Sequence, residues 1–119
     1  MNVTREQVQS WLDAYVEAWR SYDPAAIGDL FTEDARYAYR PHEARLEGRE
    51  AIVASWSESP DAPGSWEAGY APFMIEGDRA IATGETFYPA EGRFSNLFVL
   101  RFAEDGRCSE FVEWFIQQD

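Results

Sequence analysis

Hydrophobic residues near the start of the chain repeat at the spacing of an amphipathic helix. Thr4 and Gln7 form a capping-box pattern, and Val3 and Val8 have the spacing of the hydrophobic staple that accompanies it. The positions that recur at i, i+3, i+4 and i+7 are Val8, Trp11, Leu12, Tyr15, Val16 and Trp19. The pattern predicts a helix that starts at this box and turns one broad apolar stripe toward the interior.

Two further helices and a short strand are predicted before residue 60. Asp23 followed by Pro24 is an N-cap followed by proline at the first helical position, so a short helix is expected to run through Phe31 and to end in the next three residues. The alternation of large and small residues over 35–39 predicts a strand. A third helix is expected over 48–57.

The rest of the chain has the pattern of strands separated by turns. A loop containing Pro60, Pro63 and Gly64 comes first. Strands are predicted over 66–75, 80–88, 93–102 and 107–116, with hairpin turns at 77–78 and 105–106. Helices followed by an antiparallel meander indicate an α+β domain whose helices cover one face of the sheet.

The last strand is apolar on both of its faces. Alternate positions place one set of side chains on each face, Phe111, Glu113 and Phe115 on one and Val112, Trp114 and Ile116 on the other. A single domain would leave one of these faces in water. The pattern therefore predicts a homodimer that packs through the outer face of the sheet.

Composition narrows the possible functions. The chain of 119 residues fits a single domain, 1–119, and its aromatic content of 16% is high. A net charge of -12 argues against binding to nucleic acid or to anionic membranes. The single cysteine, Cys108, and the single histidine, the absence of a signal core and the lack of phosphate-binding or metal motifs favour a cytoplasmic protein without a cofactor.

Three segments resemble the nuclear transport factor 2-like superfamily. They are YVEAWRSYDPAAIGDLFTED from Tyr15, the GREAI segment, and the ending EDGRCSEFVEWF. Within the superfamily the chain is most similar to the small SnoaL-like proteins, which include polyketide cyclases, ketosteroid isomerases, dehydratases and limonene epoxide hydrolases. The resemblance implies a cone-shaped fold, in which three N-terminal helices close a strongly curved, mostly antiparallel sheet around a pocket, usually in a dimer.

The resemblance carries over few catalytic residues. Tyr15 matches the catalytic tyrosine of ketosteroid isomerases, but their two carboxylates fall at Tyr39 and near Phe98, which disfavours that mechanism. Glu113 falls at one of the two catalytic carboxylates of limonene epoxide hydrolases. The partner residues expected on the preceding strands are replaced around Glu85 and Phe87.

Two carboxylates are the main candidates for chemistry. Glu113 is expected on the pocket face between Phe111 and Phe115, and Glu85 beside Phe87 on a neighbouring strand. In an apolar cavity one of two such acids would stay protonated near neutral pH, which pairs an acid with a base. The alternatives are a salt-bridged or hydrogen-bonded structural role for Glu113 and an exposed position for Glu85.

The other candidates would hold or orient a ligand. Tyr15, Tyr39 and His42 are candidates to assist catalysis, His42 from the cavity mouth, although a lone loop histidine is usually solvated. The candidates for ligand contacts are Trp19, Tyr37, Trp56, Phe87, Asn96, Phe98, Phe111 and Phe115. Core packing is the alternative for the aromatic residues, and for Asn96 the alternative is that it satisfies local backbone groups at the start of a strand.

Two functions follow from these patterns. The first is a cofactor-independent lyase, isomerase or hydrolase that acts by acid–base chemistry on a small, largely apolar metabolite of aromatic, polyketide or terpenoid type. The second is a ligand-binding or dimerisation module without catalysis. The missing steroid-isomerase carboxylates favour the second.

Overall fold

The first helix begins at the predicted capping box. The computed structural model describes residues 1–118, and in it helix α1 (Arg5–Ser21) follows the N-cap residue Thr4. The backbone N–H of Gln7 donates to Thr4 Oγ1 at 3.1 Å, and the N–H of Thr4 donates to Gln7 Oε1 at 2.8 Å. These bonds satisfy amides that the first turn leaves without helical partners. The predicted stripe is buried from Val8 to Tyr15.

The second helix is shorter than predicted. Helix α2 (Pro24–Asp29) is capped by Asp23 as expected, but strand β1 (Phe31–Ala38) starts at Phe31, so the helix predicted through Phe31 is wrong. The physical reason is competition for the Leu30 carbonyl, which accepts hydrogen bonds from Trp11 Nε1 at 2.9 Å and from the N–H of Cys108 at 2.8 Å. These tertiary hydrogen bonds thus favour the extended conformation in a segment whose local pattern favours a helix.

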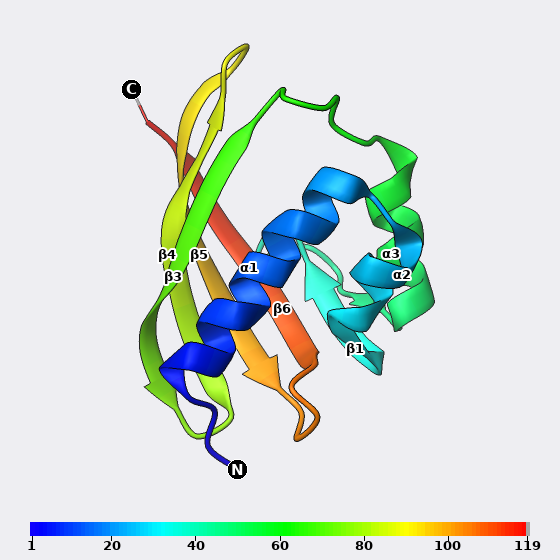
Figure 1. Cartoon of the computed structure of the whole chain (residues 1–119), viewed down its shortest axis with the longest axis vertical. Helices are drawn as coiled ribbons and strands as arrows, with labels where there is room; N and C mark the ends of the chain where they lie inside the picture. Colours follow the sequence, from blue (N-terminus) through cyan, green and yellow to red (C-terminus); the bar gives the residue numbers. More distant parts are fainter. Residues whose placement is uncertain (119) are drawn as a thin grey trace.

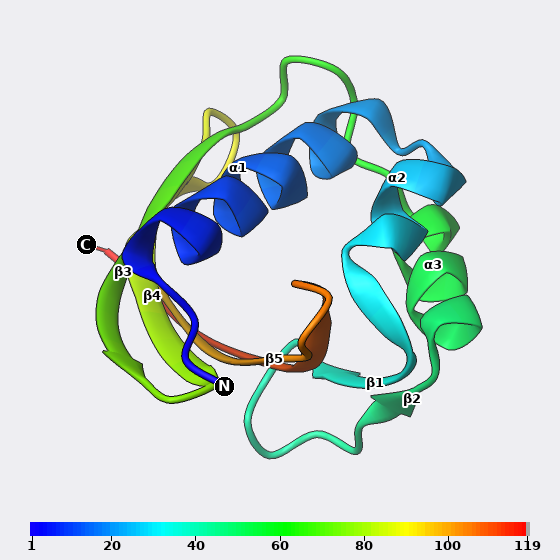
Figure 2. The same cartoon turned by 60° about the horizontal axis from the view of Figure 1, so that its bottom comes forward.

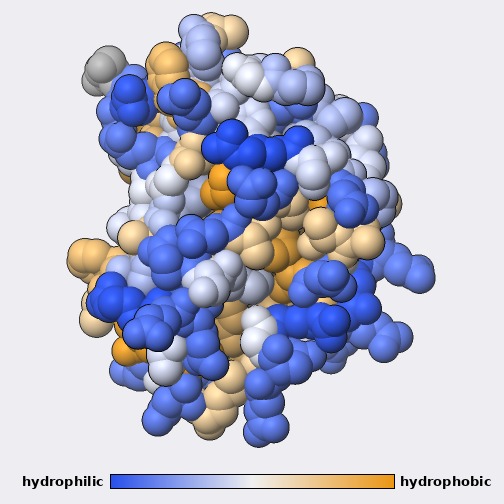
Figure 3. Space-filling model, in the orientation of Figure 1, coloured by the Kyte–Doolittle hydropathy of each residue, from blue (hydrophilic) through white to orange (hydrophobic). Residues whose placement is uncertain are grey.

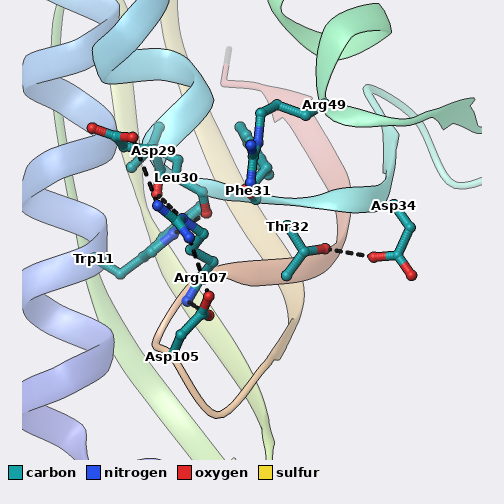
Figure 4. A network of polar contacts seen from close by, with 9 residues as sticks. All are labelled: Trp11, Asp29, Leu30, Phe31, Thr32, Asp34, Arg49, Asp105 and Arg107. Carbon is teal, nitrogen blue, oxygen red and sulfur yellow. Dashed lines mark hydrogen bonds and ion pairs between the residues drawn. The ribbon is translucent and has the colours of Figure 1, made fainter.

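An arginine fixes the same junction from the opposite side. Arg107 Nε donates to the Asp29 carbonyl at 3.3 Å, and its guanidinium also contacts the carboxylates of Asp29 and Asp105 (Figure 4). Arg49 Nε donates to the Phe31 carbonyl at 3.0 Å (Figure 4). The Arg107 contacts tie the end of α2 to the turn before β6, and the Arg49 contact ties the start of β1 to the first residue of the third helix.

The remaining elements match the predicted ones within one residue at each end. They are α3 (Arg49–Glu58), β3 (Glu67–Glu76), β4 (Arg79–Tyr88), β5 (Gly92–Phe102) and β6 (Cys108–Gln117), together with a two-residue strand, β2 (Leu46–Glu47), that the pattern did not predict. The strand order is β2-β1-β6-β5-β4-β3. All neighbours are antiparallel except β1 and β6, which are parallel.

The sheet curls and the helices line its hollow side. Figure 2 shows α1 crossing the concave face, while α2 and α3 close the side next to β1, and the sheet itself stays open. Gly84 permits close approach inside the curve: a Cβ there would meet the Gly69 carbonyl and would lie 2.6 Å from a ring carbon of Tyr70. This is the predicted α+β cone of three helices on a curved, mostly antiparallel sheet.

One end of the cone is filled by a solid aromatic core. Trp11 lies edge-on to Phe31 and Phe102, with ring centroids 6.0 and 5.8 Å apart, and Tyr37 stacks on Phe111 at 4.5 Å. The other end, at the top of Figure 1, is bordered by the C-terminal end of α1, the loop after α3 and the β4–β5 hairpin.

The convex face of the sheet carries exposed apolar side chains. Trp114 is 52% exposed and Ile116 74% exposed. The opposite face of the molecule, which carries α1, is mostly hydrophilic (Figure 3). No helix within residues 1–118 has both the length and the apolar character that a membrane crossing requires.

Candidate functional site

The concave side of the sheet holds a cavity of about 570 Å³. Its walls come from α1, α3, the loop after α3 and the strands β1, β3, β4, β5 and β6. Its volume lies within the range of ordinary small-molecule pockets. Eight residues predicted to form the site line it: Tyr15, Trp19, Tyr37, Tyr39, Trp56, Asn96, Glu113 and Phe115.

Strand register points Glu113 into this cavity. Glu113 is paired with Phe98 on β5, and Phe98 with Ala82 on β4, both of them buried on the concave face. Phe111, two residues before Glu113 on β6, is fully buried on the same face. The carboxyl group therefore lies on the pocket face, as the alternation along the last strand predicts.

A chain of side-chain hydrogen bonds ends on Glu113. Tyr70 OH lies 2.6 Å from Thr86 Oγ1, Thr86 Oγ1 donates to Asn96 Oδ1 at 2.9 Å, and Asn96 Nδ2 donates to Glu113 Oε2 at 2.8 Å. Because Thr86 gives its only hydroxyl proton to Asn96, the Tyr70 hydroxyl must donate to Thr86. Every donor in the chain thus points toward the carboxylate, and Oε1 of Glu113 stays available to a ligand or to water.

The cavity perturbs the ionisation of Glu113. Burial raises its pKa from an ordinary 4.5 to about 7, while the Asn96 hydrogen bond and the nearby charge of Arg40 act in the opposite direction. Desolvation disfavours the charged form more than these two contacts favour it. A carboxyl group with this pKa exists in both protonation states near neutral pH, so it can donate or accept a proton.

The tyrosines around Glu113 are held in their neutral form. Burial raises the pKa of Tyr15 and of Tyr37 well above the usual range, and the proximity of Glu113 raises both further. Burial also raises the pKa of Tyr39, whose hydroxyl lies 2.9 Å from Ser55 Oγ. A neutral phenol keeps its proton, so these groups can serve as hydrogen-bond donors to a ligand.

Two predicted site residues lie on the wrong face of the sheet. Glu85 is on the convex side, where Arg93 Nη1 donates to its carboxylate at 3.3 Å, and Phe87 lies beneath the same guanidinium at 5.0 Å. The even-numbered residues of β4, including Thr86, face the cavity instead. The prediction that Glu85 and Glu113 share one pocket is wrong. On β4 the larger side chains, such as Phe87, point to the convex face, and the small ones point to the cavity side.

Three other candidates lie outside the cavity lining. His42 is exposed in the loop between β1 and β2, so its expected place at the mouth is wrong. Phe98 and Phe111 face the concave side but are 1% and 0% exposed, and they pack beneath the cavity as core. They hold the floor of the site instead of meeting a ligand.

Several lining residues were missed from sequence. Tyr70, Thr86 and Tyr88 lie on the concave face of β3 and β4, where they alternate with convex residues. Assigning the correct face of these strands to the cavity would have identified them. Tyr22 and Asp61 belong to loops, where alternation gives no signal. Asp61 Oδ2 accepts hydrogen bonds from Trp19 Nε1 at 3.0 Å and from the Tyr22 hydroxyl at 3.3 Å, so it ties the loop after α3 to the end of α1.

Neither a metal site nor a reactive thiol competes with Glu113 in the described part of the chain. No three His, Cys, Asp or Glu side chains within residues 1–118 gather as metal ligands. Cys108 is fully buried, and burial raises the pKa of its thiol to about 12. A thiol in that state is a poor nucleophile.

Comparison with known families agrees with this architecture. The model of the SnoaL-like domain family matches residues 12–111, which is most of the chain. This protein belongs to the SnoaL-like domain family. The match includes most of α1 and ends at Phe111, two residues before Glu113. No curated protein matches the sequence.

Solved structures share the fold of this SnoaL-like domain at low sequence identity. An NTF-2 like protein of unknown function from Burkholderia xenovorans LB400 superposes with a TM-score of 0.75 and 22% identity, covering 96% of this chain and 86% of that one. A proposed ketosteroid isomerase from Kribbella flavida DSM 17836 gives 0.73 and 19%, covering 97% and 82%. An ntf2-like protein of unknown function from Mesorhizobium loti gives 0.67 and 24%, covering 94% and 93%. Such likenesses establish the nuclear transport factor 2-like fold.

Proposed function

We propose that this SnoaL-like domain is a cofactor-independent lyase, isomerase or hydrolase that acts on a small, largely apolar metabolite. Glu113 is the general acid or base in this proposal. The observation that carries it is a carboxyl group with a pKa of about 7, on the wall of a cavity large enough for a small organic molecule. The structural neighbour from Kribbella flavida, a proposed ketosteroid isomerase, is consistent with proton-transfer chemistry in this fold.

The surrounding groups have defined parts in this proposal. Asn96 fixes Oε2 of Glu113, which leaves Oε1 to exchange a proton with the substrate. Tyr15 and Tyr39 orient the substrate by donating hydrogen bonds to an oxygen atom on it, and the rings of Trp19, Tyr37 and Trp56 hold its apolar body. The proton transfers of this proposal use only side chains of the chain itself, and in the case of hydrolysis water is the second reactant.

The experiment compares Glu113→Gln with Glu85→Gln. Both variants remove one carboxylate, one from the cavity and one from the convex face. We would measure deuterium incorporation into 2-tetralone in D₂O and hydrolysis of styrene oxide, which report proton transfer at a ketone and opening of an epoxide. Loss of a general acid or base costs about 100-fold or more, so we expect activity to fall by that factor in Glu113→Gln and to persist in Glu85→Gln.

Retained activity in a folded Glu113→Gln variant would remove Glu113 from the mechanism. Circular dichroism and the denaturation midpoint would establish that both variants are folded. The paired design separates loss of the site carboxylate from the loss of one negative charge.

A second candidate function is binding without catalysis. It is favoured by the position of Glu85, which leaves Glu113 without a second carboxylate of the predicted pair. If the wild-type protein bound 2-tetralone or styrene oxide saturably without deuterium exchange or hydrolysis, that result would support binding without catalysis over the enzyme.

We also propose that a second copy of the chain covers the convex face, which gives a homodimer. Support comes from the apolar side chains exposed there, Val99 at 39%, Trp114 at 52% and Ile116 at 74%, on the adjacent strands β5 and β6. An apolar patch of this kind favours burial in an interface. A pairing through the same patch on both copies is self-complementary.

A further inference from the structure

The charges around the cavity are unbalanced. Four carboxylates line it, those of Glu58, Asp61, Glu91 and Glu113, against one guanidinium, that of Arg40. Arg40 is paired with Glu43 outside the lining, its Nη1 3.2 Å from Glu43 Oε2. Within residues 1–118, none of the four lining carboxylates takes part in an ion pair. Acidic side chains therefore outnumber basic ones in the lining, with Arg40 as the one basic group near Glu113.

Asp61 lines the cavity and contacts only neutral hydrogen-bonding groups. Its partners Trp19 and Tyr22 are neutral donors, and the backbone N–H of Asp61 donates to the Tyr22 hydroxyl at 2.8 Å. The carboxyl group of Asp61 is thus held in place with an indole and a phenol beside it.

The rings around this carboxyl group are already in place. Trp19 stacks on Trp66 with centroids 3.5 Å apart and planes 11° apart, which fixes one face of the indole against the protein. Ten lining residues are aromatic, and most of them are tyrosines or tryptophans. The faces of such rings are negative and attract organic cations, more strongly where water is excluded.

The field of the carboxylates reaches the lining tyrosines. The pKa of Tyr88 is raised first by burial and then by the charges of Asp61, Glu113 and Glu91. The pKa of Tyr70 is raised by burial and, in addition, by Glu113. Glu113 thus lies close enough to act on the hydroxyl groups of both Tyr70 and Tyr88, on β3 and β4.

We propose that the ligand of this cavity is an organic cation: an apolar or aromatic amine whose ammonium group lies against Asp61 and the rings of Trp19 and Tyr22. The inference rests on the proposed function, since it names the substrate class of the same site. The apolar body of the amine lies deeper, toward Glu113, and the net charge of -12 attracts cations to the protein as a whole.

Three probes that share a phenyl ring and differ in charge test this inference. Phenethylamine is a cation at neutral pH, 2-phenylethanol is neutral, and phenylacetate is an anion. Their dissociation constants would be measured at low salt by NMR titration of the tryptophan indole N–H signals. We expect phenethylamine to bind about tenfold more tightly than 2-phenylethanol, and phenylacetate to bind most weakly.

The matched variants are Asp61→Asn and Asp13→Asn. Asparagine at 61 retains an oxygen that can accept from Trp19, so the loop stays attached while the charge is lost. Asp13 is exposed on α1, outside the lining, and its replacement changes the net charge equally. We expect Asp61→Asn to weaken phenethylamine severalfold and to leave 2-phenylethanol unchanged, and Asp13→Asn to change neither.

Any of four results would overturn the inference. They are equal binding of the amine and the alcohol, tightest binding of phenylacetate, no binding of any of the three probes, and equal effects of the two variants. Its failure is distinct from failure of the proposed function. A preference for the amine in a protein whose Glu113→Gln variant keeps full activity would retain the ligand class and discard the catalytic role.

Discussion

The two faces of the last strand, β6, both carry apolar side chains and have opposite surroundings. On β6, Phe111 is fully buried on the concave face, whereas Trp114 and Ile116 on the convex face are 52% and 74% exposed. The concave face is covered by α1 (Figure 2), whereas on the convex face the β1–β2 loop lies near Glu110 and Val112 and leaves Trp114 and Ile116 exposed. The comparison teaches that alternation defines two faces but does not say which one the chain itself buries.

A polar residue has a different meaning on each face. Glu113 interrupts an apolar row on the concave side, where burial raises its pKa to about 7. Glu85 interrupts the convex side, where it is half-exposed and paired with Arg93. The same residue type is therefore a candidate acid or base on one face and an ordinary surface ion pair on the other.

The largest expected effect is the loss of a concave ring. Phe111→Ala should lower the free energy of unfolding by about 3–5 kcal/mol, because it removes a ring that stacks on Tyr37 at 4.5 Å and leaves a cavity behind. Phe111→Leu should cost less, and it provides a folded variant if the alanine does not fold. Urea denaturation at low protein concentration measures both.

The convex control for this experiment is Trp114→Ala. Its side chain is half exposed, so at a protein concentration that favours the monomer we expect a loss of no more than about 1 kcal/mol. Equal losses at positions 111 and 114 would contradict the assignment of one face to the core.

The next effect is the pH dependence that Glu113 gives to stability. Its pKa is about 7 in the folded state and near 4.5 when the side chain is in water. Below the lower value both states bind the proton and the stabilising contribution is complete. It is lost as the pH rises through about 7, when the buried group must ionise, and the full loss is about 3 kcal/mol.

Glu113→Gln isolates this contribution from that of the other acids. The stability difference between wild type and Glu113→Gln, measured by denaturation from about pH 4 to about pH 8, should shift against the wild type across that window. Glu85→Gln removes one carboxylate from the convex face and is the matched control for the change in net charge. A constant difference across the window would mean that Glu113 is solvated in the folded protein.

Sequence reasoning predicted the elements well and the assignment of faces less well. The capping box at Thr4 and the turn at Gly77 are local signals, and the helix and strand they define lie where predicted. The end of α2 depends on Trp11 and Cys108, which are distant in sequence, so no local pattern contains it. At this junction, long-range partners overrode a local pattern that favours a helix.

The candidate site divides in the same way. Glu113 could be predicted because β6 alternates regularly between apolar rings. Glu85 was misplaced because β4 carries small residues, Ala80, Ala82 and Gly84, on the face under the helices and bulkier ones outside. Asp61 lies in a loop, and its link to Trp19 exists only once the chain has folded.

The smallest expected effect on folding, and the most specific one on association, concerns Trp114. Trp114→Thr keeps a residue type suited to a strand and removes most of the apolar area that this side chain would bury in the proposed homodimer. Since the side chain is half exposed in the monomer, the free energy of unfolding of the monomer should change by less than about 1 kcal/mol. Sedimentation should show a dimer in the wild type and a shift toward monomer in Trp114→Thr. Phe115→Thr alters the cavity mouth on the concave face and should leave association unchanged. If Phe115→Thr dissociates the protein and Trp114→Thr does not, the copies meet across the mouth of the cavity, because only the concave residue would then contribute to the interface.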